Sequence, residues 1–499
     1  GGGGVGDLNE VHRMETFDMD ATNGFLDSKW YHLYCSVQRC NSALRVLNAA
    51  TDEQVNGRVS RIAEMKVLRA HYYFELSRLF NKIPYFDENV EISQYPDIPN
   101  NEFTRDEILS MLAEEMLDAA EQLPASQSEV GRIHKYIALA YAAKIKLYQA
   151  YQQDETTHAV TSINKELLRE VVSLCDQVTA SNRYGLLDDF QGLDLVAIQY
   201  SMNDGTESAG RINWSNLLNS PGGGSPYGGD GFFLPSQDLI NAYQTDANGL
   251  PDFNYQSKSD YSWAVLNNGV YTLQNTTPNV DPRLDFVVGR PTITWKTYPD
   301  KPCEGWVRDK ETYGYNCAKR FWVSPESSDM FNGWPWGASQ LNWQIIRYAD
   351  ILLWKAEALI ELNEGNGLET ARDLINQIRN RARNSAYVKD FNDHSKYAAN
   401  YLVNPYPADV WNQDYARQAL RWETRLEKAL EGERFFDLVR WGIVETTMNK
   451  YITAESDNRI YYANAHFTGG KDEYYPVPNN QYGFSGGKYV QNPGYAPFN

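Results

Sequence analysis

One loop of the sequence combines aromatic and amide side chains in a way that suits the binding of sugars. The stretch NGWPWG, residues 332–337, places Trp334 and Trp336 on either side of Pro335, with Asn332 beside them. Sugar rings present apolar C–H faces that stack on aromatic rings, and their hydroxyl groups take hydrogen bonds from amide and charged side chains. Because a side chain on such a glycine-bounded loop is hard to bury, we expect both tryptophans to be exposed and to contact a glycan.

The same combination recurs in the loops that precede this stretch. EGWVRDK, residues 304–310, sets a tryptophan beside an arginine, DYSW sets two aromatic residues beside Asp260, and a glycine-rich loop at 220–231 holds a tyrosine. The predicted glycan contacts are therefore Tyr227, Tyr261, Trp263, Trp306, Arg308, Asn332, Trp334 and Trp336. For each aromatic residue, the competing interpretation is that it packs against the helices.

No motif for catalysis or for a metal centre stands out. The seven histidines are scattered without an HExxH spacing, the five cysteines form no CxxC pair, and no GxSxG or P-loop motif occurs. A glycosidase needs two carboxylates about 5 or 6.5–9.5 Å apart, and no motif isolates such a pair among the 65 acidic residues. We expect no catalytic residue, no metal centre and no cofactor. A structural calcium ion in an oxygen-rich loop and a disulfide between Cys303 and Cys317 stay open.

The composition is that of a globular, acidic and aromatic-rich protein. The 499 residues include 46 basic and 65 acidic side chains, and the resulting net charge of −19 argues against nucleic acid as a partner. No apolar run approaches the roughly 18 residues needed to cross a bilayer. The 34 tyrosines and 13 tryptophans exceed the usual needs of a core and favour a recognition surface. The chain opens with four glycines and shows no signal peptide, so we expect a cytosolic protein or a processed or truncated form.

Helices must hold these loops in place. Residues 347–382 have apolar side chains at helical spacing on both sides of the turn NEGNG, which predicts a helical hairpin of about 34 residues. A single hairpin cannot bury both of its faces, so it needs partners. Further helices are indicated over residues 26–50, 58–86, 105–122, 132–152, 164–180 and 415–442. The predicted fold is mainly α, with four tetratricopeptide-like helical hairpins and an irregular loop-rich subdomain packed against them.

The helical pattern also suggests a division of the chain. Helical periodicity fades after about residue 185 and returns near residue 341, while glycine, proline, asparagine, tyrosine and tryptophan become frequent between them. We therefore expect an N-terminal helical part (1–184), a loop-rich insertion with the ligand-binding face (185–340), and a C-terminal helical part with a tail (341–499). Together they form one unit.

Charged residues near the end of the chain are expected to hold the scaffold together. Arg434, Asp437 and Arg440 are spaced by three and share a helix face, which predicts a buried ion network that ties the last hairpin to its neighbour. The same interpretation, with pairing inside one hairpin, applies to Glu357, Arg379 and Arg383.

Five blocks of the sequence resemble the SusD/RagB family. They are AEMKVLRAHYYFELSRLFNKIPYF (63–86), RYADILLWKAEALIELN (347–363) followed by LINQIRNRA (374–382), LEKALEGERFFDLVRWG (426–442), YYPVPNNQ (474–481) and QNPGY (491–495). The third block matches the family pattern Glu-x-Gly-x-Arg-x-x-Asp-Leu-x-Arg-Trp through Glu431, Gly432, Arg434, Asp437, Leu438, Arg440 and Trp441. The blocks lie in the right order along the chain.

The resemblance implies a lipid-anchored protein exposed at the surface of a Gram-negative outer membrane. Members of the family bind oligo- or polysaccharides without catalysis and deliver them to a SusC-like TonB-dependent transporter. This sequence contains no lipobox cysteine, so the N-terminal lipid anchor, which would be its contact with the membrane, is implied by the resemblance alone. Two alternatives stay open: a peptide- or protein-binding partner of the transporter without a sugar site, and a glycoside-degrading enzyme.

Overall fold

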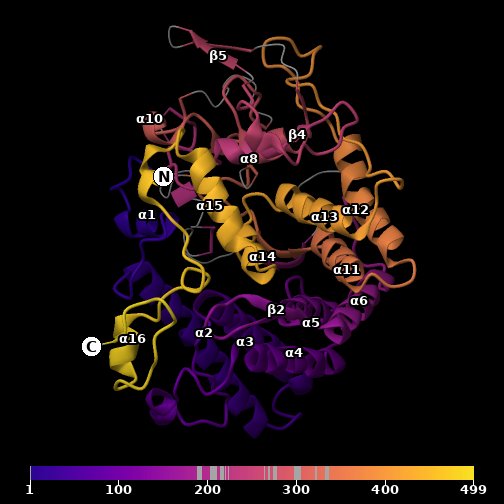
Figure 1. Ribbon diagram of the computed structural model, residues 1–499. Coiled ribbons are helices and arrows are strands. Elements are labelled where there is room, and N and C mark those ends of the chain that lie inside the picture. Colours follow the sequence, from indigo (N-terminus) through magenta and orange to yellow (C-terminus); the bar gives the residue numbers. More distant parts are fainter. Residues whose placement is uncertain are drawn as a thin grey trace.

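A continuous array of helices forms the scaffold of the protein (Figure 1). The computed structural model describes residues 2–187, 194–202, 211–213, 218–219, 221–222, 224–262, 264–267, 270–273, 278–296, 305–320, 323–331 and 337–498. The helices of the array are α2 (Gly24–Ala49), α3 (Arg58–Phe80), α4 (Arg105–Gln122), α5 (Lys135–Ala150), α6 (Lys165–Ala180), α11 (Tyr348–Leu362), α12 (Gly367–Asn384) and α13 (Gln413–Glu427). Each helix packs against the next in this order. The predicted mainly α fold of tetratricopeptide-like helices with a loop-rich part against them is confirmed.

The helices pack in pairs, and the third pair, α6 with α11, joins segments on either side of the loop-rich insertion. α6 precedes the insertion and α11 follows it, yet the two helices pack closely against each other. α11 also packs against α12 and α13, so the hairpin at 347–382 is shared between two pairs. The boundaries 1–184, 185–340 and 341–499 remain a prediction.

Among the described helices, none combines the length and the apolar character that a bilayer-spanning helix requires.

Local signals set the ends of these helices. The Thr104 hydroxyl accepts a hydrogen bond from the backbone N–H of Glu107, while Glu107 Oε2 accepts from the backbone N–H of Thr104 at 2.8 Å. This capping box begins α4, as its sequence predicts. α11 ends where Asn363 adopts a left-handed φ of 51°, which breaks the helix at the NEGNG turn.

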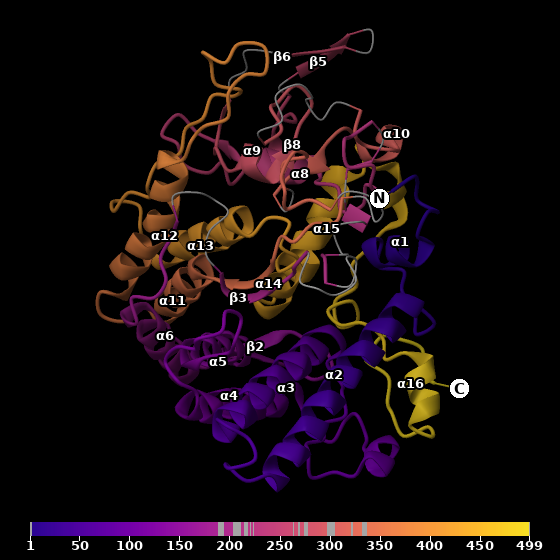
Figure 2. The ribbon, with the colours of Figure 1, turned by 180° about the vertical axis from the view of Figure 1, so that it is seen from behind.

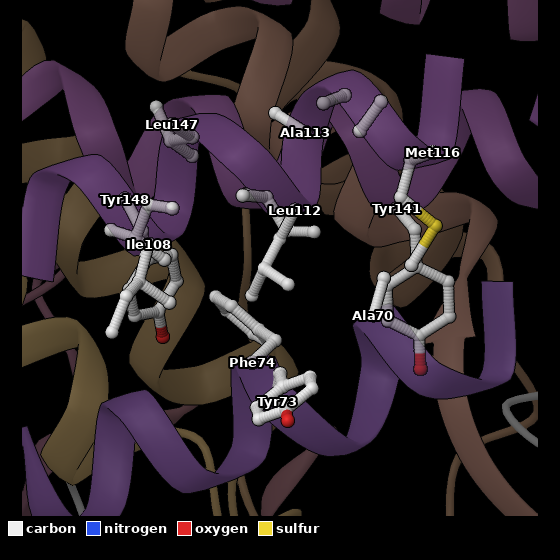
Figure 3. Packing of buried hydrophobic residues seen from close by; sticks show 14 of the residues in the cluster. Ala70, Tyr73, Phe74, Ile108, Leu112, Ala113, Met116, Tyr141, Leu147 and Tyr148 are labelled. Atoms are coloured by element: carbon white, nitrogen blue, oxygen red, sulfur yellow. The ribbon is translucent and has the colours of Figure 1, made fainter. Parts of the chain in front are cut away.

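The main hydrophobic core lies between α3, α4 and α5 (Figure 3). Phe74 on α3 points toward Leu112 on α4, and its ring lies edge-on to Tyr148 of α5 with centroids 5.1 Å apart. α3 is buried on two sides because α2 covers one side and α4 the other. Each fully buried leucine or phenylalanine here contributes about 1.5–3 kcal/mol of transfer free energy.

The loop-rich part lies across one end of the array, at the top of Figures 1 and 2. It contains the short helices α8 (Gln237–Ala242), α9 (Leu284–Val287) and α10 (Lys310–Tyr313). Its strands form two-stranded antiparallel pairs: β4 (Gln244–Thr245) with β7 (Asn279–Val280), β5 (Ala264–Asn267) with β6 (Val270–Leu273), and β8 (Val288–Gly289) with β9 (Cys317–Ala318). Elsewhere, β1 (Tyr151–Gln153) pairs with β2 (Val160–Ile163), and β3 (Asp194–Ile198) pairs with β10 (Trp343–Arg347), which leads into α11.

The end of the chain returns to its beginning. After α14 (Arg434–Arg440) and α15 (Val444–Glu455), the tail with α16 (Asn479–Phe484) runs back along the first hairpin, and α1 (Asn9–Glu15) lies on the same side (Figures 1 and 2). The Asn492 side chain donates to the backbone oxygens of Phe80 and Tyr475, both at 2.7 Å. The bond to Phe80 caps the C-terminal end of α3, and the bond to Tyr475 joins two parts of the tail, so the QNPGY block serves the scaffold.

A buried ion network ties α14 to α11, as predicted for Asp437 and Arg440, whereas Arg434 donates to the backbone oxygen of Arg421 at 3.5 Å. Arg440 donates to Asp437 at 3.0 Å and forms an ion pair with Glu357 of α11. Glu357 also accepts from the Trp441 indole at 2.8 Å and from the Tyr151 hydroxyl at 2.7 Å.

The predicted pairing inside the 347–382 hairpin is wrong. Glu357 binds Arg440 of α14, Arg379 binds Glu423 of α13, and Arg383 is exposed. The reason is that Glu357 of α11 and Arg379 of α12 face the helices that cover the hairpin, where these buried charges meet their counterions.

A row of carboxylates on and after α13 holds the loop-rich part against the helices. Glu427 forms ion pairs with three arginines from different segments, Arg283, Arg347 and Arg381, at 3.4, 3.0 and 2.6 Å. Burial alone would raise the pKa of Glu427, but the attraction of these guanidinium groups overcomes it and lowers the pKa well below its usual range.

We expect Glu427→Ala to reduce the free energy of unfolding by about 3–5 kcal/mol, because the substitution leaves buried arginines without their shared carboxylate. Urea denaturation followed by circular dichroism measures the change. The control is Glu364→Ala, since Glu364 pairs with Arg169 on the surface and both side chains are largely exposed. Similar losses in the two variants would contradict the assigned role of Glu427.

Candidate functional site

A cavity lies where the loop-rich part meets the segment that follows α12. We call it cavity A; its volume is about 800 Å³. Its apolar and aromatic lining consists of Phe286, Val323, Leu341, Tyr387 and Val388. Its neutral polar and histidine lining consists of Thr294, Ser324, Ser327, Asn342, Gln344 and His394. Its charged lining consists of Lys296, Lys319, Arg320, Lys389, Asp285, Glu326 and Asp329.

Three tyrosines cluster on the segment beside cavity A. The rings of Tyr387 and Tyr401 have centroids 5.1 Å apart, and Tyr397 meets Tyr387 edge-on at 5.4 Å. Tyr397 is 54% exposed, and the Lys389 ammonium lies 3.9 Å from the centre of its ring. This places an aromatic surface next to hydroxyl, amide and ammonium groups, which is the combination that sugar recognition requires.

The same segment is fixed to α9 and to the strand pair behind it. Asp285 accepts two hydrogen bonds from Arg290, at 2.8 and 2.7 Å, and a third from the Tyr401 hydroxyl. Burial raises the pKa of Tyr401 well above its usual value, so the hydroxyl stays protonated and remains a donor. The Thr294 hydroxyl donates to the backbone oxygen of Lys389 at 3.2 Å. The segment 387–401, part of which lines cavity A, is therefore bonded both to Asp285 of α9 and to Thr294.

A second cavity, cavity B, has a volume of about 380 Å³. It lies between α8, the segment after α10, and the end of α15. Its lining consists of Pro235, Gln237, Asp260, Tyr261, Ser262, Pro291, Tyr313, Gly314, Tyr315, Asn316, Glu455, Asn458 and Arg459. Asp260 and Asn458 are exposed, whereas Tyr313, Asn316, Glu455 and Arg459 are buried. The cavity therefore has a polar rim and a buried polar base.

Glu455 is an unusual carboxyl group at the base of cavity B. Burial raises its pKa to about 7, although Arg459 opposes this shift from 3.8 Å away. One carboxyl oxygen accepts from the backbone N–H of Asp238 at the start of α8. The group is thus near half protonation at neutral pH and can both donate and accept a hydrogen bond.

Two of the predicted glycan contacts form a small core instead. The rings of Tyr227 and Trp306 are buried and pack edge-on around Trp295, and Trp295 and Trp306 have centroids 5.0 Å apart. The Trp295 indole donates to the Tyr227 hydroxyl, which donates to the backbone oxygen of Val323 at 2.6 Å. Both rings are therefore packed in a core, as in the competing interpretation, although they pack against loop residues and not against the helices. In a segment with little regular structure, large rings supply the buried apolar area that helices supply elsewhere.

The other predicted contacts have different outcomes. Tyr261 is also buried, and it lines cavity B. Arg308 is partly exposed, pairs with Asp7 at 3.3 Å, and lines neither cavity. The remaining four lie outside the described residues, so they stay predictions: Trp263, Asn332, Trp334 and Trp336.

Two further expectations are not tested. Cys303 lies outside the described residues, and the Cys317 thiol is buried 3.7 Å from the backbone oxygen of Gly289. Within the described ranges, no group of three or more His, Cys, Asp or Glu side chains is arranged to hold a metal ion. A structural calcium ion therefore remains a prediction.

Comparison with known proteins identifies the family. The profile of the SusD family matches residues 196–495, which is more than half of the chain. A second profile, described as starch-binding and associating with the outer membrane, matches residues 7–147. The chain belongs to the SusD family.

Individual relatives of this SusD-family protein are distant but cover nearly all of it. A SusD-like protein, P2, from Formosa agariphila is 23% identical over 501 residues, which span 99% of this chain and 85% of the relative. A solved SusD homologue from Bacteroides thetaiotaomicron has a TM-score of 0.70 at 18% identity, covering 99% of this chain and 90% of that one. A solved laminarin-binding SusD-like protein has a TM-score of 0.61 at 20% identity, covering 99% and 91%.

The residues that mark the SusD family in this sequence belong to the scaffold. Arg440 and Trp441 bind Glu357 inside the helical array, and neither residue lines cavity A or cavity B. The sequence interpretation missed the Tyr387–Tyr401 segment because it lies after residue 340, beyond the expected ligand-binding insertion. A sequence signal for this segment exists, since AYVKDFNDHSKYAANY (386–401) mixes aromatic, amide and charged residues as the stretches 304–310 and 332–337 do.

Glu455→Gln should change how stability depends on pH. In the wild type the pKa rises from an ordinary 4.5 to about 7 on folding, so the folded state holds the proton more tightly. The free energy of unfolding therefore falls as pH rises from about 4.5 to 7, and the loss persists above pH 7. Glutamine carries no charge and keeps an oxygen for the N–H of Asp238.

We expect Glu455→Gln to be more stable than the wild type at pH 8, by about 1–3 kcal/mol, with little difference at pH 4.5. Urea denaturation at the two pH values measures both quantities. Parallel pH profiles for the two proteins would show that Glu455 titrates like an ordinary surface carboxyl.

Proposed function

We propose that this SusD-family protein binds an oligo- or polysaccharide at the cell surface, without catalysis, and delivers it to a SusC-like TonB-dependent transporter in the outer membrane. Membership of the family supports the proposal, as does the likeness to a laminarin-binding protein of the same fold. In this proposal the protein is held at the membrane by a lipid anchor and needs no cofactor. The net charge of −19 agrees with a partner other than nucleic acid.

Cavity A is the observation that carries the proposal. Its volume lies within the range of sites that enclose small ligands, and it joins the Tyr387 ring to hydroxyl, amide and ammonium groups. The partly exposed Tyr397 extends the aromatic surface beyond the cavity, which suits a chain longer than one sugar unit. Individual affinities should be micromolar to millimolar, because sugar hydroxyls exchange hydrogen bonds with water for similar bonds with protein.

The test uses Tyr387, whose ring lines cavity A and whose hydroxyl donates to the backbone oxygen of Arg383 at 2.8 Å. We expect Tyr387→Ala to weaken glycan binding about tenfold, since an aromatic contact contributes up to about 1.5 kcal/mol. Tyr387→Phe keeps the ring and should bind nearly as the wild type. Tyr31→Ala on the exposed face of α2 is the matched control.

Affinity gel electrophoresis and calorimetry against laminarin and other plant, algal and microbial polysaccharides give the affinities. Binding that is equally strong in Tyr387→Ala would remove cavity A from the site. If no polysaccharide binds the wild type, the glycan proposal fails and a peptide- or protein-binding role becomes the better one. Release of reducing sugar during incubation would instead establish an enzyme.

A further inference from the structure

Three buried polar atoms around cavity B have no hydrogen-bond partner among the described residues. They are the Tyr313 hydroxyl, Asn316 Oδ1 and Glu455 Oε2. Their residues are 4%, 7% and 1% exposed, and all three line the same cavity. Glu455 Oε2 lies 3.8 Å from Arg459 Nε, which is an ion-pair distance without a hydrogen bond. Buried polar atoms in native proteins are hydrogen-bonded in more than about 90% of cases, so three atoms without a hydrogen bond around one space indicate a polar occupant.

We propose that cavity B is a second binding site, for a single neutral sugar unit, separate from cavity A. The proposal rests on the side chains of cavity B and does not require that cavity A binds a glycan.

The chemistry of the lining selects this class of ligand. An amide oxygen only accepts hydrogen bonds, while a tyrosine hydroxyl and a carboxyl near half protonation can donate or accept. A sugar hydroxyl also does both, so one ring with several hydroxyls can satisfy all three atoms. Tyr261, Tyr313 and Tyr315 line the same space and offer apolar ring surface to sugar C–H groups.

Charged ligands fit less well. An anion would meet the carboxyl groups of Asp260 and Glu455, and a cation would meet the buried guanidinium of Arg459. Arg459 is itself engaged, since it donates to the backbone oxygens of Leu234 and Pro235 at 3.3 Å and pairs with Glu15 at 3.4 Å. The positive charge of Arg459 and the carboxyl groups of Asp260 and Glu455 therefore largely offset one another in the lining.

The two cavities are built on the same strand pair but from different residues. β8 and β9 join the segments that line both spaces: Asp285 to Lys296 around β8, and Tyr313 to Arg320 around β9. No residue lines both cavities, so a variant in one leaves the lining of the other unchanged.

The experiment compares the wild type with Tyr313→Phe, which removes only the unpaired hydroxyl. Because that hydroxyl has no hydrogen-bond partner in the described part of the chain, the melting temperature should stay the same or rise. Binding of D-glucose, D-galactose or D-mannose, measured by saturation-transfer NMR titration, should be millimolar and should weaken roughly three- to tenfold in Tyr313→Phe. Asn316→Ala should weaken it similarly, and Tyr31→Phe on α2 is the matched control. D-glucuronate should bind less tightly than D-glucose.

Monosaccharide binding that is unchanged in both Tyr313→Phe and Asn316→Ala would overturn the proposal. So would the absence of monosaccharide binding in a protein that still retains polysaccharide, since cavity B would then hold water only. A third outcome separates the two cavities. If the wild type binds monosaccharide but no polysaccharide, and Tyr313→Phe loses the monosaccharide, the result supports cavity B and refutes the role of cavity A.

Discussion

The loop-rich part keeps its position because of one row of buried carboxylates. Glu423, Glu427 and Glu431 lie about one helical turn apart at the end of α13 and just beyond it. They bind arginines that arrive from segments far apart in the sequence: Arg283, Arg320, Arg347, Arg379 and Arg381. Arg283 and Arg320 belong to the loop-rich part, and the other three precede or belong to α11 and α12. The same acidic row thus fastens the irregular segment and the helical array together.

Breaking one of these ion pairs costs free energy of folding, because both the carboxylate and the guanidinium group are buried away from water. Arg379 and Glu423 are fully buried, and Arg379 also donates to the backbone oxygen of Gly249 at 2.7 Å. Removing one partner leaves the other charged in a medium of low polarity, which costs far more than an exposed pair contributes. Arg320 extends the network to cavity A, since it binds Glu431 and also lines that cavity. The geometry of the cavity therefore depends on ionic contacts outside it.

The helices could be predicted from the sequence because their signals are local. Apolar spacing, the capping box at Thr104 and the left-handed turn at Asn363 act within a few residues. Ion-pair partners could not be predicted in the same way. Arg379 pairs with a residue 44 positions later in the chain, and only the packed array brings the two together.

The exposure of aromatic side chains also lies beyond local sequence signals. Tyr227 and Trp306 stand in polar, glycine-containing stretches, as an exposed sugar platform would, yet they are buried. Tyr397 stands in a comparable stretch and is more than half exposed. The difference lies in the neighbours: Trp295 covers Tyr227 and Trp306, whereas Tyr397 lies at the edge of its cluster. Such neighbours are set by tertiary contacts, so the loops around a site are the hardest part to derive from sequence.

The buried aromatic rings still serve the site by positioning its walls. Gly289 of β8 carries no Cβ, and one placed there would lie 2.8 Å from the Cys317 sulfur and nearer still to the Trp295 ring. The glycine therefore lets Trp295 pack directly on the strand pair. From Trp295, hydrogen bonds lead through Tyr227 to Val323 on the wall of cavity A, and Tyr313 of the same cluster lines cavity B. The buried aromatic cluster thus connects the wall of cavity A with the wall of cavity B.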